Sequence, residues 1–434
     1  MTYKQTVAFL YDQLPMYSRI GTIAYKKDLF NIIELCAVLG NPHTTFKSIH
    51  IAGTNGKGST SHMLAAIFQA SGYKTGLYTS PHLKDFRERI KVNGVMCSES
   101  FVINFVKKIQ HTIKKIKPSF FEVTVAMAFE YFAQQQIEIA IVEVGLGGRL
   151  DSTNIVQPVL SVITNIGYDH MPMLGNTLAE IAYEKAGIIK NNVPVVIGEK
   201  LTETELIFEQ QAIKHKAPIH FAQKEWTVLD WEYKNHQLLI NIDCHHKKEI
   251  ETYILDLIGL YQTKNILTVL ETIHQMQLQG WNIATVVVKK ALKEVKKITG
   301  LHGRWEIVHQ HPTIILDVAH NVDGIKQIVN QLEITNYNHL HIIIGMAKDK
   351  DVIDVLKLLP HNATYYFTKA QIPRALSEKE LSEKASSIGL KGKSFSNVNT
   401  AIHFVLQEAT SDDLILICGS VFLVGEVEYP LIFS

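Results

Sequence analysis

The sequence has few cysteines and almost no net charge. Cys36, Cys97, Cys244 and Cys418 lie far apart in a chain of 434 residues, without the dense spacing of a disulfide scaffold, so we expect reduced structural thiols. Lys plus Arg number 43 against 42 Asp plus Glu, and no overall positive field therefore favours phosphate backbones or anionic lipid. We expect neither a nucleic acid nor a membrane as a partner.

Long apolar runs are missing as well. Residues 1–20 are interrupted by Lys4, Asp12 and Arg19, and so lack the unbroken apolar core of a secretory signal. No stretch approaches the roughly 18 uncharged apolar residues that a membrane span needs. These absences predict a cytoplasmic protein.

The sequence does contain enough apolar residues for two cores. Hydrophobic residues make up 46% of the chain, and its length exceeds what one core usually serves. Strands are predicted over 46–53, 75–80, 137–145, 159–167 and 193–198, and helices over 61–72, 121–135 and 178–190. Because the strand runs are continuously apolar, both faces should be covered, as in a mostly parallel sheet wrapped by helices.

A second alternation of strand and helix begins near residue 302. Before it, residues 224–254 predict an antiparallel ribbon, and helices are predicted over 260–276 and 285–300, the latter with one solvated Lys-rich face. Strands then follow at 313–320, 339–347, 363–370 and 413–420, with a helix over 352–359. We predict an α/β protein with a P-loop nucleotide-binding domain at 1–298 and a smaller Rossmann-like α/β domain at 299–434.

A glycine-rich loop, GTNGKGS at 53–59, lies between a predicted strand and a predicted helix. Such a loop turns backbone N–H groups and the positive end of the helix toward a phosphate, and Lys57 would reach the β and γ phosphates. The loop departs from the strict G-x-x-x-x-G-K-[ST] pattern, because Ile51 stands five residues before Gly56 and Gly58 directly follows the lysine. An ordinary glycine-rich turn is the alternative, but the convergence of glycines, lysine and hydroxyls favours a nucleotide site.

Six separated segments resemble those of a known family. They read AGTNGKGSTS, YTSPHLKDFRERI, VEVGLGGRLDSTN, GYDHMPMLGNTLAEIAYEKAGIIK, HGRWE and LDVAHNVDG, and they occur nearly end to end in the family's order. The sequence thereby resembles the bacterial folylpolyglutamate synthase/dihydrofolate synthase family, part of a wider superfamily that includes the Mur peptidoglycan ligases. Gly58, the SPHL segment and HGRWE point to the folate branch.

The resemblance implies ATP and Mg²⁺ as cofactors and assigns residues to both. Around the nucleotide it places Thr54, Asn55, Gly56, Lys57, Gly58, Ser59, Asn265, Arg304 and Asp317. On the magnesium ion it places Ser80, Glu143 and His170. Hydroxyl and carboxylate oxygens suit this hard cation, and the first two residues end predicted strands at the edge where open α/β sheets bind ligands. An imidazole is a less usual magnesium ligand.

The resemblance also implies catalytic and substrate-binding residues. It names Lys57, Lys185 and His320 as catalytic, and Lys185 matches the family lysine that is carbamylated by carbon dioxide. From the residues alone, an ordinary surface lysine on a helix is the simpler interpretation of Lys185. His320 and Ser420 would lie near the incoming glutamate, and a second group would hold dihydropteroate, namely Phe120, Phe121, Glu122, Leu150, Asp151 and Ser152. The two phenylalanines fit the core at the start of a helix equally well.

The implied reaction is an ATP-dependent ligation. The γ-phosphoryl group of ATP would activate a carboxylate of folate or dihydropteroate, and the amine of L-glutamate would attack the acyl phosphate, in an enzyme expected to be a monomer. A Mur-type amino-acid ligase and a P-loop NTPase of another role remain alternatives. A metal-binding module at Cys244-His245-His246 is disfavoured because no second ligand pair follows at zinc-like spacing, and we expect that cluster to be solvated.

Overall fold

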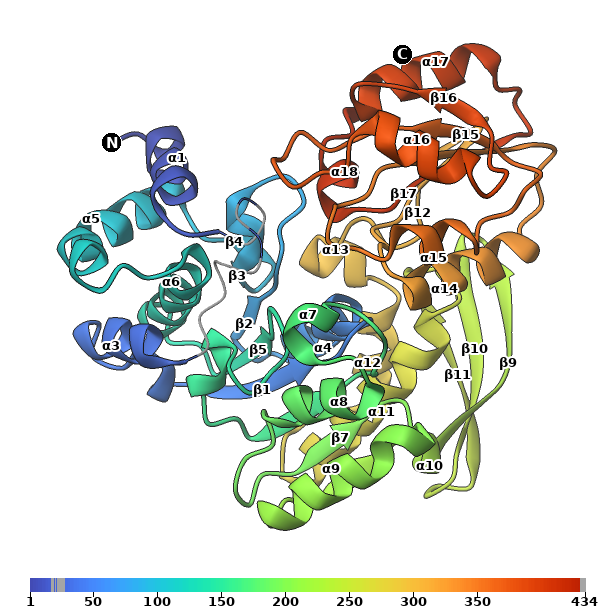
Figure 1. The fold of residues 1–434 in the computed structure, drawn as a ribbon. Coiled ribbons are helices and arrows are strands. Elements are labelled where there is room, and N and C mark those ends of the chain that lie inside the picture. The colour runs from blue at the N-terminus through green and yellow to red at the C-terminus, as the bar shows by residue number, and fades with distance from the viewer. Residues whose placement is uncertain (17–18, 20, 22–27, 430–434) are drawn as a thin grey trace. The chain divides into compact units, whose positions relative to one another are not determined.

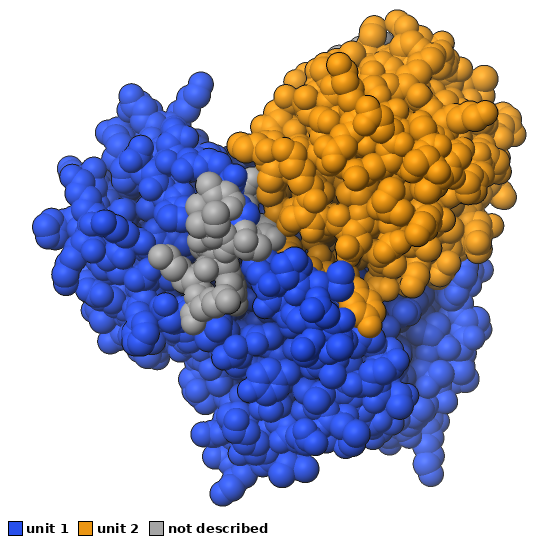
Figure 2. Space-filling view, in the orientation of Figure 1, with its two compact units in different colours: residues 1–167, 171–256, 261–301 blue, residues 168–170, 257–260, 302–434 orange. Residues whose placement is uncertain are grey.

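The computed structural model describes residues 1–16, 19, 21 and 28–429, which form two compact units (Figure 2). Unit 1 comprises residues 1–167, 171–256 and 261–301, and unit 2 comprises residues 168–170, 257–260 and 302–434. The main change of unit therefore falls between Leu301 and His302. The domain boundary predicted at 298/299 stays a prediction. The sequence did not predict that the short segments 168–170 and 257–260 belong to unit 2.

Unit 1 is built on an eight-stranded sheet of order β4-β3-β2-β5-β1-β6-β7-β8 (Figure 1). Its strands are β1 (Lys47–Ala52), β2 (Thr75–Tyr78), β3 (Ile90–Val92), β4 (Val95–Met96), β5 (Ile139–Glu143), β6 (Leu160–Ile163), β7 (Val195–Ile197) and β8 (Ile219–Phe221). From β2 to β8 in this order every pairing is parallel, whereas β3 and β4 add an antiparallel edge. The mostly parallel sheet predicted from the apolar runs is confirmed.

Helices cover both faces of this sheet, as its buried strands require. Helices α4 (Lys57–Ala70) and α11 (Gln262–Leu278) pack together on one face. On the other face, Ala140 and Val142 of β5 join the apolar cluster of α6 (Phe120–Gln134), and Val195 and Ile197 of β7 join that of α8 (Leu178–Ala186) and α9 (Thr202–Lys214). The remaining described helices of unit 1 are α1 (Tyr3–Gln13), α3 (Phe30–Val38), η2 (Pro42–Thr44), η3 (Phe86–Arg89), α5 (Glu99–Ile116), η4 (Ser152–Ile155), α7 (Met171–Leu174), α10 (Ala222–Glu225), α12 (Thr285–Leu292) and α13 (Val295–Thr299).

An antiparallel ribbon completes unit 1, as residues 224–254 predicted. It has the order β11-β10-β9, with β9 (Trp226–Lys234), β10 (Gln237–Cys244) and β11 (Glu249–Leu255). The single helix predicted over 285–300 is wrong, because α12 ends at Leu292 and α13 starts at Val295. Glu294 between them lies outside the helical region at φ −133°, ψ 26°. Val288, Leu292 and Val295 are buried while Lys290 and Lys293 are exposed, in agreement with the predicted solvated face.

Unit 2 has a six-stranded sheet of order β12-β13-β17-β14-β15-β16. The strands are β12 (Glu306–Gln310), β13 (Thr313–Leu316), β14 (Leu340–Ile344), β15 (Thr364–Phe367), β16 (Gly392–Ser394) and β17 (Leu414–Cys418), and the helices are α14 (Val322–Glu333), α15 (Val352–Leu356), α16 (Glu378–Ser386), α17 (Val398–Glu408) and α18 (Val421–Gly425). Only β12 pairs antiparallel among these strands. The second α/β unit is thereby confirmed, although α14, α16 and α17 were not predicted.

Two absences expected from the sequence bear on the fold. All four cysteines are buried free thiols, and burial raises the pKa of Cys36 and Cys97 to about 12. The expectation that Cys244 belongs to a solvated cluster is wrong, because its side chain is fully buried on β10 while His245 and His246 are exposed. In the described part of the chain, no helix is both long and apolar enough to cross a bilayer.

Candidate active site

The phosphate loop connects β1 to α4, and its glycines are required by close packing. Gly53 and Gly56 have φ angles of +148° and +83°, in the region that side chains disfavour. A Cβ on Gly53 would overlap the hydroxyl of Thr164, and a Cβ on Gly56 would overlap the side-chain oxygen of Asn265. The glycine loop that was predicted from the sequence is therefore packed against two other segments of unit 1, which carry Thr164 and Asn265.

Residues 164–167, which follow β6, hold the loop by hydrogen bonds. Asn55 N–H donates to Asn165 Oδ1 at 2.8 Å, and the Thr164 hydroxyl donates to the carbonyl of Asn55 at 2.6 Å. Thr54 Oγ1 both donates to the Gly167 carbonyl at 3.1 Å and accepts from the Gly167 N–H at 3.0 Å. The hydroxyl of Thr54 thus shapes the loop, and backbone N–H groups at the start of α4 are the donors suited to a phosphate.

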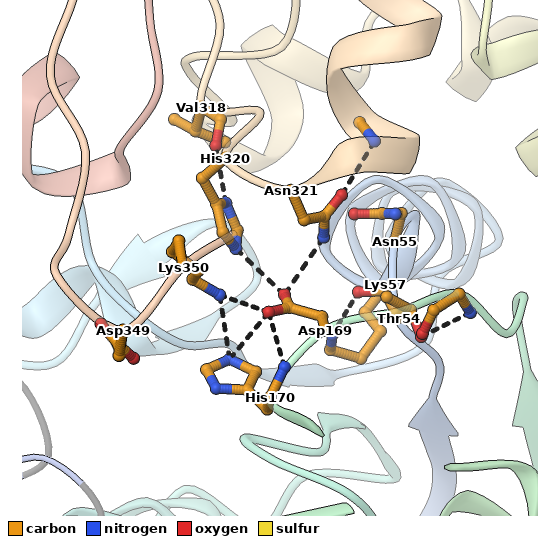
Figure 3. Close-up of polar contacts among 12 residues, drawn as sticks. Thr54, Asn55, Lys57, Asp169, His170, Val318, His320, Asn321, Asp349 and Lys350 are labelled. Carbon is orange, nitrogen blue, oxygen red and sulfur yellow. Dashed lines mark hydrogen bonds and ion pairs between the residues drawn. The ribbon is translucent and has the colours of Figure 1, made fainter. Parts of the chain in front are cut away.

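Two lysines converge on the first residue of this loop. Lys57 Nζ donates to the carbonyl of Gly53 and to that of Thr54, each at 3.0 Å, and Figure 3 shows Lys57 beside Thr54. Lys185 Nζ, from the last turn of α8, donates to the same Gly53 carbonyl at 2.8 Å. The surface interpretation of Lys185 is wrong, since the residue is 4% exposed. Lys185 is therefore a buried residue that contacts the phosphate loop.

Ser80 and Glu143, which were predicted as magnesium ligands, lie side by side. They follow and end the neighbouring parallel strands β2 and β5, and the Ser80 N–H donates to Glu143 Oε2 at 3.1 Å. Glu143 is 5% exposed, so its carboxylate is withdrawn from solvent at the carboxyl edge of the sheet. A hydroxyl and a carboxylate oxygen in this position fit a hard divalent cation.

Helix α11 supports the phosphate loop from the side. The side-chain oxygen of Asn265 lies against the Cα of Gly56, in the space that a Cβ there would need, and Asn265 Nδ2 donates to Gln262 Oε1 at 2.8 Å. Gln262, which is fully buried, in turn donates to the Ser59 hydroxyl at 3.2 Å. The sequence singled out Asn265 but not Gln262, because a glutamine inside a helix carries no pattern of its own.

The residues predicted to hold dihydropteroate fall into two groups. Phe121 lies against Gly145, at a distance that leaves no room for a Cβ, and Asp151 closes the loop after β5 by accepting from Leu146 N–H at 2.9 Å. Phe120, by contrast, is a core residue at 4% exposure, packed between the rings of Tyr11 and Phe86.

Glu122 and the segment after Asp151 are also partly committed to the fold. Glu122 Oε2 accepts from the Ser119 N–H at 2.6 Å and completes the N-terminal capping box of α6. Leu150 is half-buried and Ser152 is 9% exposed, at the start of η4. Phe121 and Leu150 therefore present more accessible apolar surface than Phe120 does.

In unit 2, the carboxylate of Asp169 gathers polar side chains from three segments (Figure 3). Lys350 Nζ donates to Oδ1, as does the backbone N–H of His170 at 2.8 Å. Asn321 Nδ2 donates to Oδ2 at 3.1 Å, and His320 Nε2 lies 3.4 Å from the same oxygen. The side chains of Asp169 and Lys350 are 9% and 7% exposed, so this is a buried ion pair with further hydrogen bonds.

This cluster sets the charge of its members. Burial alone would raise the pKa of Asp169, but the Lys350 ammonium holds it well below its usual range. Burial, and then the charge of Lys350, lowers the pKa of His170 to about 3. His170 is therefore a neutral imidazole near neutral pH, the form in which histidine binds metals. Its φ of +53° shows that the local backbone is unusual for a side chain of this size.

The other predicted residues of unit 2 lie at the carboxyl ends of β13 and β17. Asp317 Oδ2 accepts from the Trp305 N–H and Oδ1 from the Ala319 N–H, both at 2.8 Å, so it fixes the loop that carries Arg304. His320 Nδ1 donates to the Val318 carbonyl at 2.9 Å, which leaves Nε2 directed to Asp169.

Ser420 belongs to the same edge of the sheet. Its hydroxyl caps α18 by accepting from Phe422 N–H at 3.2 Å, and the preceding Gly419 N–H donates to the Ala319 carbonyl at 2.9 Å. Because β13 and β17 are parallel neighbours, the segments that carry His320 and Ser420 follow adjacent strands at one edge of the sheet. The glutamate-binding role that the resemblance assigned to these two residues stays a prediction.

Comparisons with known proteins place this arrangement in a family. The Mur ligase middle domain matches residues 51–273, and the Mur ligase glutamate ligase domain matches residues 303–421. A dihydrofolate synthase/folylpolyglutamate synthase of Bacillus subtilis is 33% identical over 417 residues, covering 94% of this chain and 95% of that protein. This chain belongs to the dihydrofolate synthase/folylpolyglutamate synthase family.

Solved structures of the synthase family have the same fold. Escherichia coli FolC in complex with DHPP and ADP superposes with a TM-score of 0.83 at 28% identity, covering 98% of this chain and 96% of that chain. A bifunctional folylpolyglutamate synthase/dihydrofolate synthase with Mn, AMPPNP and L-glutamate bound gives a TM-score of 0.84 at 27% identity, covering 99% and 98%. The resemblance stated from six sequence segments is confirmed.

Several polar residues of this synthase were missed at the sequence level. Lys350, Asn321 and Asp169 were not assigned a role. Asn321 carries a readable signal, because it precedes α14 and its Oδ1 caps the Gly324 N–H at 2.8 Å. Lys350 carries none, since it is one of several charged residues in a KDKD segment. Only the tertiary structure selects it.

Proposed function

We propose that this chain is an ATP-dependent ligase that joins L-glutamate to folates and to dihydropteroate through an amide bond. Its family membership supports the reaction class, and relatives bound to ADP, to AMPPNP with Mn and to L-glutamate support these ligands. The observation that carries the proposal is the glycine loop 53–59, which residues 164–167 hold in place and whose Lys57 lies at the start of α4. A cation and backbone N–H groups at such a loop are suited to hold and align a triphosphate.

The chemistry follows from what a carboxylate needs. A carboxylate oxygen of the substrate attacks the γ-phosphorus, the bond to the β,γ-bridging oxygen breaks, and ADP leaves. The neutral amine of glutamate then attacks the acyl carbon, phosphate departs, and the nitrogen loses one proton to solvent and keeps the other as the amide N–H. No protein nucleophile is required, and the work of the chain is to neutralise charge and align the reacting groups.

The phosphate loop residues 53–59 and Lys57 perform that work for the nucleotide. Backbone N–H groups at the start of α4 donate to the phosphate oxygens, and Lys57 neutralises charge that moves to the β,γ-bridging oxygen. Asn265 and Gln262 keep the loop and Ser59 in place. Ser80 and Glu143 would hold the divalent cation, which supplies further neutralisation of the phosphates when bound.

We assign the glutamate-binding role to the edge of the unit 2 sheet. His320 and Ser420 lie on the segments that follow two adjacent strands there, and the Val318 carbonyl fixes the orientation of the His320 ring. Asp169 holds this ring and Asn321 in one network, so it is a positioning residue for His320. Arg304 and Asp317 remain assigned to the nucleotide from the family resemblance, with Asp317 fixing the backbone on both sides of the β12–β13 hairpin.

Lys185 is proposed to be carbamylated in the active enzyme. Its Nζ lies 2.8 Å from the Gly53 carbonyl, and reaction with carbon dioxide would replace its positive charge by a carboxylate-like group. The gain in mass can be sought by intact-mass spectrometry of enzyme kept in bicarbonate buffer and sprayed under native conditions. An unmodified lysine in fully active enzyme would contradict this assignment.

A product assay tests the proposed function. Purified protein is incubated with ATP, Mg²⁺ and L-glutamate, and either dihydropteroate or a reduced folate is offered separately. Mass spectrometry should detect a product heavier by one glutamyl residue, with one phosphate released per amide formed. Phosphate release without any amide product would favour an NTPase, and activity only with a nucleotide-linked muramyl acid would favour a Mur-type ligase.

A further inference from the structure

His50 is a buried histidine that none of the assigned roles explains. It lies in β1, three residues before Gly53, and its side chain is fully buried. Its Nε2 is 2.8 Å from the hydroxyl of Thr153, a residue that is also fully buried. A strand position between two parallel neighbours normally takes an apolar residue, so a polar ring there needs a partner and a reason.

The partner of His50 leads directly to Asp151. The Thr153 hydroxyl contacts both His50 Nε2 and Asp151 Oδ1, and the Thr153 N–H also donates to Oδ1 at 2.9 Å. The other oxygen, Oδ2, accepts from the Leu146 N–H at 2.9 Å. The Asp151 carboxylate therefore links the beginning of the 145–154 segment, at Leu146, to its end, at Thr153. His50 contacts the hydroxyl of Thr153, which makes the second of these two links.

The directions of these hydrogen bonds assign the proton on His50. Burial raises the pKa of Asp151, and the bonds from Thr153 and Leu146 oppose that rise. Both carboxylate oxygens accept backbone N–H groups, an arrangement that favours the ionised form. The Thr153 hydroxyl then donates to Asp151, so its remaining partner must donate to it, and His50 carries its proton on Nε2.

Two observations agree with this tautomer. Burial, and then the charge of Lys190, lowers the pKa of His50 to about 3, so the ring is neutral and has a single N–H. Its other nitrogen, Nδ1, is buried and has no hydrogen-bond partner among the described residues. A bare acceptor nitrogen there is consistent with the N–H being used at Thr153.

The segment that His50 holds carries the residues proposed for the pteroyl group. It runs from Gly145, against which Phe121 lies, through Leu150, Asp151 and Ser152. Both carboxylate oxygens of Asp151 accept N–H groups of the segment's own backbone, so Asp151 stabilises the conformation of this segment. A shift of this backbone by a fraction of an ångström would displace the surface offered to an aromatic ring.

We propose that His50 is a positioning residue for the folate substrate, acting through the Thr153 hydroxyl on Asp151 and the 145–154 segment. The inference rests on the proposed function and adds to it a residue in the strand that enters the phosphate loop. It predicts that the Nε2–H donor, rather than the ring, is what the site needs. A side chain with a donor at that position should replace histidine, and one without it should not.

Three substitutions at one position test the inference. In His50→Gln the side-chain amide reaches the place of Nε2, whereas in His50→Asn it stops near Nδ1, and His50→Leu has no donor. With a reduced folate as variable substrate, we expect His50→Leu and His50→Asn to raise KM for folate about tenfold or more. KM for ATP should change less than twofold, and His50→Gln should stay within about threefold of the parent protein for both substrates.

Two controls separate positioning from general destabilisation. His341, a buried histidine of β14 bonded to Tyr366, gives a matched His341→Leu variant that should lose stability without any change in KM for folate. Thr153→Val removes the intermediate hydroxyl, and its effect on KM should not add to that of His50→Leu, because both break one path.

The outcomes are distinct from those of the product assay. If the parent protein forms no glutamyl product, the proposed function fails. If it forms product but His50→Gln loses as much as His50→Asn, or if KM for ATP rises as much as KM for folate, the positioning role is overturned. Additive effects of His50→Leu and Thr153→Val would likewise contradict the single path. If His50→Leu does not fold, the comparison of His50→Gln with His50→Asn still tests whether the Nε2–H donor positions the folate substrate.

Discussion

The phosphate loop of unit 1 and the Asp169 cluster of unit 2 are both polar, yet they are built in opposite ways. The loop is one continuous stretch, residues 53–59, whose backbone N–H groups are proposed to bind the nucleotide, and residues 164–167 hold it by hydrogen bonds. The Asp169 cluster is made of side chains from 168–170, 318–321 and 350 that meet around one carboxylate. The first depends on backbone conformation, and the second depends on buried charge.

The difference decides how each region responds to substitution. A loop that binds through backbone N–H groups is sensitive at its glycines, where an added Cβ changes the backbone, and at its one reaching cation. A buried ion pair is sensitive to substitution of either charged partner, because removal of one leaves the other charge unpaired in a low-dielectric interior. Four substitutions test this contrast.

The largest effect is expected from Lys57→Ala in the loop. Loss of the cation beside the transferring phosphoryl group should lower kcat by about 10³-fold, while the midpoint of thermal unfolding changes little. Steady-state phosphate release and circular dichroism measure the two quantities. Lys214→Ala, at the exposed end of α9, is the control and should keep normal turnover. Near-normal turnover of Lys57→Ala would remove the loop from the reaction.

Asp169→Asn should have its main effect on stability. The Lys350 ammonium would stay buried without its counter-charge, so the free energy of unfolding should fall by about 3 kcal/mol. Urea denaturation followed by tryptophan fluorescence measures this, and a second change, Lys350→Gln, should recover part of the loss. Asp354→Asn breaks the exposed pair with Lys357 and should cost no more than about 0.5 kcal/mol. Equal effects of both substitutions would refute the buried-pair description.

Gly56→Ala tests the backbone requirement of the loop. Its Cβ would meet Asn265 as well as the strain of a φ of +83°, so the loop must shift and KM for ATP should rise about tenfold. Gly280→Ala is matched to it, because φ there is +89° and no atom lies within 4 Å of the added Cβ. That variant should lose only about 1 kcal/mol of stability and keep its KM for ATP.

The smallest effect is expected from Asn321→Ala. The substitution removes the cap of α14 and one hydrogen bond to the Asp169 carboxylate. Asn397→Ala removes a similar cap from α17, where Asn397 Oδ1 accepts from the Thr400 N–H at 2.9 Å. Each cap is worth about 1 kcal/mol, so the loss in Asn321→Ala should exceed that in Asn397→Ala by about 1 kcal/mol. Urea unfolding of the two variants gives this difference, and equal losses would show that the Asp169 bond contributes nothing.

Much of the fold could be predicted because it depends on local patterns. Continuous apolar runs marked β1, β5, β6, β7, β14 and β17, and these became the central parallel strands of both sheets. The prediction failed where one amphipathic sequence pattern continued past the end of a helix. At Glu294 this pattern covers two helices instead of one. Helices α14, α16 and α17 were not predicted, although the segment LDVAHNVDG contains the first residues of α14.

The residues of the candidate site likewise divide into those that could be predicted from the sequence and those that could not. The glycine loop was predicted from its residues, and Ser80 and Glu143 were implied by the family resemblance; the structure places these two residues side by side. The burial of Lys185 could not be predicted, since a lysine on a helix is more often solvated. Lys350 could not be paired with Asp169 either, because 181 residues separate them in the chain.

The sequence by itself determined the α/β class, the phosphate loop and the family, because these depend on residue order within short segments. Tertiary structure alone decided which lysines face the Gly53 carbonyl, which carboxylate holds Lys350 and which hydroxyl His50 contacts. The physical reason is that a buried charge or donor is satisfied by whatever partner packing brings within about 3 Å. That partner is set by the path of the whole chain.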